Sequence, residues 1–156
     1  MNVSVLSYSF RGLLGSGEMD VFGYLEACRH RYGLSLADIW NGFLESVDAE
    51  YLRKIRNALD ERELGLADLC VDQAHIWDDD EAARAKNYEN ALAHLTAADI
   101  LGARFVRIDA GSRDDAWTEE QFDHIVTRYK EYAAFAHDHG FKVGIENHWG
   151  PERGWA

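Results

Sequence analysis

Residues 142–148 read K-V-G-I-E-N-H, and this stretch is the most informative part of the sequence about the fold. Its alternation predicts a strand whose Val143 and Ile145 pack on helices. Glu146 and His148 then point to the opposite face, at the carboxyl end of the strand. A carboxylate there is better explained as a metal ligand or an acid–base group than as packing. The alternative is that Glu146 pairs with an inward-facing cation.

The stretch 105–109, F-V-R-I-D, repeats this pattern one strand earlier. Val106 and Ile108 are expected to face helices, and Arg107 and Asp109 to face inward. Arg107 is a candidate for substrate binding, with an internal ion pair as the alternative. Asp109 is a candidate for the same site, with capping of the following turn as the alternative.

Working outward, short β-rich runs alternate with longer amphipathic runs along the whole chain. The strand-like runs recur about every 30–38 residues, which suits one βα unit each. We expect strands at 3–8, 36–40, 66–71, 105–109 and 142–146, a glycine-rich loop at 11–17, and helices at 20–32, 49–62, 80–101 and 118–139. Asp48, Asp80 and Thr118 are the expected N-caps, the last in a capping box with Gln121.

Such alternation is typical of an α/β protein with a parallel sheet. An open doubly wound sheet would suit the 156-residue length, since a complete (β/α)8 barrel needs about 250 residues. The first loop, however, does not place a dinucleotide-binding G-x-G-x-x-G after its strand. The motifs therefore favour a partial (β/α)8 TIM barrel, made of strands 1–5 and four helices.

Composition narrows the function classes. Hydrophobic residues make up 47% and charged residues 28% of the chain, as in globular proteins. The formal net charge of −12 disfavours a nucleic-acid partner, and no apolar run is long enough for a membrane span. The start lacks the basic region of a signal peptide, and two cysteines, Cys28 and Cys70, are expected to be reduced, so we expect a cytoplasmic protein.

Ligands of parallel α/β proteins bind at the carboxyl ends of the strands. Aromatic, acidic and imidazole side chains gather at these predicted ends, a mixture suited to a metal and a polyol. His75 and His148 are candidates for substrate binding, with an exposed loop histidine and a loop brace as the alternatives. Trp40, Trp77 and Trp149 are candidate platforms for a sugar ring, although large aromatics more often serve in a core or at its rim. Histidines inside predicted helices, including His94 and His124, are expected to be structural.

The segment 141–151, F-K-V-G-I-E-N-H-W-G-P, resembles the fifth strand of the sugar phosphate isomerase/epimerase superfamily, the xylose isomerase-like TIM barrels. The segment 101–111, L-G-A-R-F-V-R-I-D-A-G, is similar to the fourth strand of that family, and L-A-D-I-W at 36–40 to its second. The resemblance covers the chain and implies that residues 1–156 are the N-terminal portion of a single barrel domain.

The resemblance implies a divalent ion, Mn²⁺, Mg²⁺ or Co²⁺, with four ligands on strands five to eight. Only the first ligand maps onto this chain, at Glu146, which would be both the metal ligand and the catalytic residue. The remaining ligands are not in this chain. Three explanations stay open: a fragment of a longer enzyme, a split subunit that completes its site by association, or a self-contained protein with a reduced site.

The implied function is a metal-dependent isomerase or epimerase of a sugar, sugar phosphate or polyol. A dehydratase or lyase of the same superfamily and a non-catalytic or split-barrel subunit are the alternatives. The negative charge argues against the endonuclease branch of the superfamily. The expected partners are a small-molecule sugar or polyol, without nucleic acid or membrane, and either a homo-oligomer or a missing C-terminal half.

Overall fold

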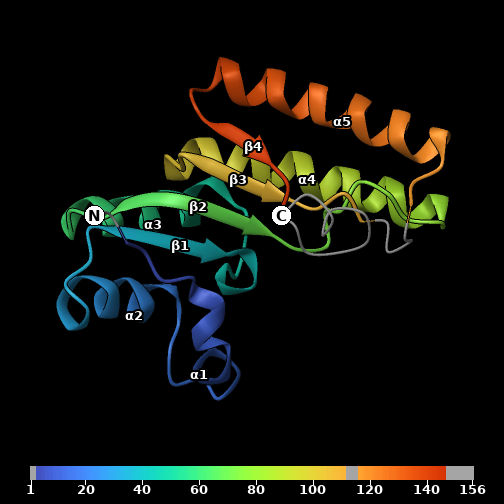
Figure 1. The fold of residues 1–156 in the computed structure, drawn as a ribbon. Coiled ribbons are helices and arrows are strands. Elements are labelled where there is room, and N and C mark those ends of the chain that lie inside the picture. Colours follow the sequence, from blue (N-terminus) through green and yellow to red (C-terminus); the bar gives the residue numbers. More distant parts are fainter. Residues whose placement is uncertain (1–2, 112–115, 147–156) are drawn as a thin grey trace.

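A computed structural model describes residues 3–111 and 116–146 of the chain. Four parallel strands form one sheet in the order β1-β2-β3-β4, and the arrows in Figure 1 point the same way. The strands are β1 (Leu36–Trp40), β2 (Gly65–Val71), β3 (Phe105–Ile108) and β4 (Lys142–Gly144). This order follows the chain and confirms the partial barrel rather than the doubly wound sheet.

The helices are α1 (Arg11–Gly15), α2 (Val21–Glu26) with a π-helical continuation at Ala27–Arg31, α3 (Ala49–Glu61), α4 (Glu81–Leu101) and α5 (Glu119–Asp138), and short 3₁₀ turns occupy Ser7–Phe10 and Asn41–Phe43. The helices α3, α4 and α5 each lie between consecutive strands, as the sequence pattern predicts, whereas α1 and α2 precede β1. Asp80 caps α4 by accepting the amide of Ala82, and Thr118 forms the predicted capping box with Gln121. Asp48 occupies the N-cap of α3, but its side chain makes no capping bond.

The first predicted strand, residues 3–8, is wrong as a strand: only one bridge forms, from Leu6 to Asp38. The phenol of Tyr24 lies between the two segments, within 2.6 Å of the Val5 carbonyl and 2.8 Å of the Asp38 carbonyl. In addition, the amide of Trp40 donates to the Ser7 hydroxyl at 2.8 Å. Side chains therefore take backbone groups that a longer ladder would use.

The glycine-rich stretch 11–17 was expected to be a loop, and that expectation is also wrong. Arg11–Gly15 forms the short helix α1, and Gly17 follows it with a φ of 73°. Glycine lowers helix stability without forbidding a single turn, which is why composition misleads here. The thiols of Cys28 and Cys70 are free and buried, as predicted.

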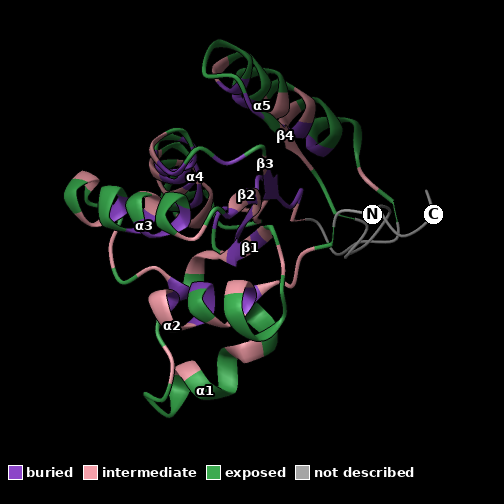
Figure 2. Ribbon diagram, turned by 90° about the vertical axis from the view of Figure 1, so that its left-hand side faces the viewer, coloured by how far each residue is buried: buried purple, intermediate pink, exposed green. Residues whose placement is uncertain are grey.

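The sheet has one apolar face and one polar face. Ile39, Leu69, Val106 and Val143 pair across the four strands, and the first three are fully buried beneath the helices. Figure 2 shows burial concentrated in the strands and on the helix sides turned toward them. Sequential parallel connections of one hand place the helices on one face. The opposite face is left for the site.

The next row across the sheet has the opposite phase: Trp40, Cys70, Arg107 and Gly144. Gly144 leaves no room for a side chain, because a Cβ there would come within 2.7 Å of the Phe105 ring. The described part of the chain contains no helix that is both long and apolar enough to cross a membrane.

Candidate active site

A pocket of about 580 Å³ opens at the carboxyl ends of the strands. The residues that line it come from every strand end of the sheet and include Trp40, Asp72, His75, Arg107, Asp109 and Glu146. The structure thus brings four of the predicted site residues, His75, Arg107, Asp109 and Glu146, into one cavity. His148 and Trp149 lie outside the described residues.

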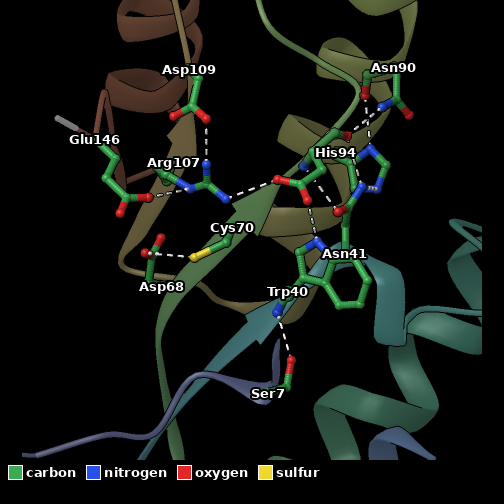
Figure 3. Close-up of polar contacts among 11 residues, drawn as sticks. Ser7, Trp40, Asn41, Asp68, Cys70, Asn90, His94, Arg107, Asp109 and Glu146 are labelled. Carbon is green, nitrogen blue, oxygen red and sulfur yellow. Dashed lines mark hydrogen bonds and ion pairs between the residues drawn. The ribbon is translucent and has the colours of Figure 1, made fainter. Parts of the chain in front are cut away.

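Arg107 is the centre of this site, and Figure 3 shows its guanidinium between carboxylates. Its Nη1 donates to Asp109 Oδ2 at 2.6 Å, its Nη2 to Asp72 Oδ1 at 3.1 Å, and its Nε lies 3.5 Å from Glu146 Oε2. The side chains of Arg107 and Asp109 are 9% and 11% exposed. Burial is the largest single effect and opposes the charge of Arg107, but Asp109 and Cys70 together outweigh it and raise the Arg107 pKa.

These contacts include the ion pair that the sequence left open as the alternative role of Glu146. They do not remove Glu146 from the solvent, because its side chain is 55% exposed while Arg107 beneath it is buried. Arg107 therefore holds three acidic groups at the floor and wall of the pocket. Its predicted role in binding substrate directly stays a prediction.

Asp72 belongs to this site, although sequence reasoning did not single it out. It follows β2 directly, and its Oδ2 accepts a hydrogen bond from the Trp40 indole at 2.7 Å. This contact fixes Trp40 at the pocket wall, where its ring meets Tyr8 edge to face at 5.0 Å. The signal that could have found Asp72 is its position immediately after a buried strand.

A second layer of polar residues holds the backbone of Asp72. Asn41 accepts the Asp72 amide at 3.0 Å and donates to the Asp72 carbonyl at 3.2 Å. Asn90 also donates to that carbonyl, and His94 lies 3.4 Å from the Asn41 amide nitrogen. Burial lowers the pKa of His94, and its ring contacts Asn41 and the Asn90 carbonyl, so this helical histidine braces the site.

The loop after β2 carries His75 into the pocket and turns Trp77 away from it. His75 Nε2 lies 3.1 Å from Asp78 Oδ2. The backbone amides of Ile76 and Trp77 donate to the carbonyls of Asp109 and Ala110 at 3.1 and 2.7 Å. Trp77 lines a different pocket, so of the predicted aromatic platforms only Trp40 is placed at this site by the described residues.

Two further acids lie deeper on the polar face of the sheet. Asp38 and Asp68 are paired residues of β1 and β2, and the Oδ1 atom of each is buried without a hydrogen-bond partner. Burial raises the pKa of both carboxyls. Cys70 donates its thiol hydrogen to Asp68 at 3.2 Å.

The carboxylates and the imidazole of the pocket are suitable donors for a divalent ion, but their arrangement does not make a complete site. Across residues 3–111 and 116–146, no three His, Cys, Asp or Glu residues are grouped closely enough to hold a metal. Three carboxylates instead surround Arg107. A metal here would need ligands beyond those described.

The sequential parallel sheet, its one-sided helices and a polar pocket at the strand ends define a partial α/β barrel with an enzyme-like site. A family model for the xylose isomerase-like TIM barrel matches residues 26–154. The chain belongs to this family.

Solved structures agree on the fold. The chain resembles the probable 3-DHS dehydratase AsbF of petrobactin synthesis from Bacillus anthracis, with a TM-score of 0.69 and 17% identity over 96% of this chain and 53% of that one. D-psicose 3-epimerase gives a TM-score of 0.69 at 17% identity, covering 96% and 55% of the two chains. The zinc-bound IolI protein gives 0.69 at 14% identity, covering 93% and 51%. This chain therefore spans about half the length of those proteins. A search of the curated proteins returned no match.

Proposed function

We propose that this chain forms the N-terminal half of a barrel enzyme that isomerises or epimerises a sugar or polyol. The observation that carries the proposal is the set of acids around Arg107 at the strand ends of a xylose isomerase-like chain. Epimerases with the same fold act on small ketoses, as their names state.

In this proposal each residue of the pocket has a distinct task. Glu146, half exposed above the buried guanidinium, exchanges a proton with the substrate carbon next to its carbonyl. Arg107 and Asp109 fix the position of Glu146 and meet the polar groups of the substrate. His75 binds a substrate hydroxyl, and Trp40 offers its ring to the apolar face of the sugar.

Metal binding is a separate part of the proposal. Glu146 contributes one carboxylate to a divalent ion, and the other ligands come from residues outside this chain. One neighbour of the same fold, IolI, contains zinc, which supports testing for such an ion. A single carboxylate cannot hold Mn²⁺ or Mg²⁺ tightly, because these ions take about six donors.

The test compares the complete protein with its Glu146→Gln form on a panel of ketoses, with metal content measured in parallel. The substitution keeps size and removes charge, so we expect turnover to fall by about a hundredfold or more. Glu61→Gln is the matched control, since Glu61 lies at the end of α3 with its side chain 75% exposed. Unchanged turnover and metal content in Glu146→Gln would contradict the proposal.

The dehydratase alternative is favoured by the equal likeness to AsbF. It predicts water loss from the substrate, followed as a new conjugated absorbance, where an epimerase gives only a change of configuration. A subunit without activity that gains turnover on mixing with a second chain would instead indicate a split barrel.

A further inference from the structure

A second pocket lies between α4 and α5 and shares no lining residue with the first. Its volume is about 520 Å³, and the two helices that form its walls lie next to each other in Figure 1. Three basic side chains line it: Arg84 from α4, and His124 and Arg128 from α5. None of these residues takes part in the proposed reaction.

Both guanidinium groups are held against aromatic rings. Arg84 lies 4.6 Å from the centre of the Trp77 ring, and Arg128 lies 4.1 Å from the centre of the Tyr88 ring. Stacking of this kind fixes a guanidinium plane while leaving its N–H groups at the edge free to donate. The His124 ring lies edge to face with the same Trp77, with ring centres 5.6 Å apart, so His124 and Arg84 share this aromatic neighbour.

The hydrogen-bonding capacity of these cations is only partly used. Arg84 donates from Nη1 to the Asp78 carbonyl at 2.5 Å, and no carboxylate of residues 3–111 and 116–146 lies within ion-pair distance of it. Arg128 donates to Glu131 at 2.8 Å, and Glu131 is shared with the Tyr88 hydroxyl. Several N–H groups of Arg84 therefore remain for a ligand.

The charges of this pocket are layered. Glu81, Glu89 and Glu120 also line it, but all three residues are exposed, whereas Arg84, His124 and Arg128 are half-buried. Solvent and salt screen the exposed acids more strongly than the partly buried cations. Burial lowers the pKa of His124, the charges of Arg128 and Arg84 lower it further, and Glu120 acts in the opposite direction.

We propose that the α4–α5 pocket binds a small anion with several oxygens, a phosphate or carboxylate group, between Arg84, His124 and Arg128. Planar guanidinium groups suit such anions, and the imidazole adds an N–H donor that also carries positive charge when protonated. The exposed acids of the same pocket favour a compact anion over a large one. The proposal is independent of the function of the strand-end pocket.

The test follows the His124 imidazole by NMR while the complete protein is titrated with inorganic phosphate or malonate, against sodium chloride at equal ionic strength. A His124→Gln form identifies the signal. Bound anion offsets the two positive charges, so we expect the pKa of His124 to rise with saturable dependence on the anion. A response to phosphate alone or to malonate alone identifies which group the site takes, and no response to either overturns the proposal.

Variants locate the effect. Arg84→Gln and Arg128→Gln should each weaken binding about tenfold, the usual scale for a lost charge-assisted contact. Arg53→Gln removes the same charge from an exposed position on α3 and should leave binding unchanged. If the Gln forms do not fold, Arg84→Lys and Arg128→Lys replace them. The Lys forms keep the charge but lose the guanidinium fork, so they should weaken binding severalfold. Equal affinity in the arginine variants and in Arg53→Gln would refute the site.

Discussion

Replacing Arg107 with Met should destabilise the fold strongly, because Arg107 is the buried counterion of the strand-end pocket. Removing one partner of a buried ion pair costs about 3–5 kcal/mol. The Arg107–Asp109 pair qualifies, with side chains 9% and 11% exposed. Asp72 and Glu146 are 45% and 55% exposed and add little, since exposed pairs are worth about 0–1 kcal/mol. We expect a loss of about 3 kcal/mol in the free energy of unfolding.

Urea denaturation followed by circular dichroism measures this loss. With a urea slope of about 2 kcal/mol/M, the midpoint should fall by about 1.5 M. Lys54→Met is the control, since the Lys54–Glu50 pair is 62% and 84% exposed and should change stability by less than about 0.5 kcal/mol.

A second variant separates lost pairing from lost packing. Arg107→Met combined with Asp109→Leu removes both charges, and such replacements often restore stability. The double variant should recover at least half of the loss. The reasoning is refuted if Arg107→Met matches Lys54→Met, or if the double variant is no more stable than the single one.

Two other changes test the surroundings of the site. Burial raises the folded-state pKa of Asp68, so this carboxyl contributes stability at low pH that is lost as the pH rises above its unfolded pKa. Asp68→Asn should therefore raise the urea midpoint at pH 7 and reduce the fall of that midpoint with rising pH. An unchanged pH profile would contradict the burial argument. Gly111 has a φ of 97°, and a Cβ there would lie 2.3 Å from the Trp77 carbonyl oxygen. Gly111→Ala should therefore lower the free energy of unfolding by about 2 kcal/mol or more. A melting temperature equal to that of the parent protein would rule this out.

The alternation of F-V-R-I-D correctly predicted which side chains of this strand are buried with the core and which line the pocket. Alternation along a strand determines which face of the sheet each side chain points to. Because Val106 and Ile108 point to the apolar face, Arg107 and Asp109 must point to the opposite one. Periodicity does not give partners across strands. The bond from Trp40 to Asp72 joins residues 32 positions apart, and no spacing in the sequence encodes it.

The errors near the N-terminus have a related cause. The β-rich run at 3–8 has the composition of a strand. However, the Tyr24 phenol occupies the Val5 carbonyl, and the Ser7 hydroxyl occupies the Trp40 amide, so these backbone groups do not pair with each other's strand. Tertiary contacts of single hydroxyl groups override a weak local preference. The same limit applies to the α4–α5 pocket, because the stacking of Arg84 on Trp77 depends on a turn that composition does not reveal.

The sheet order β1-β2-β3-β4 has a consequence for how the chain is made. Each strand pairs with the one synthesised just before it, so no strand must wait for a distant partner. A ribosome adds about 5–20 residues per second, and a βα unit of this length emerges within seconds. This order would allow the sheet to lengthen during translation, one unit at a time, with Arg107 and Asp72 both outside the ribosome before Glu146 emerges.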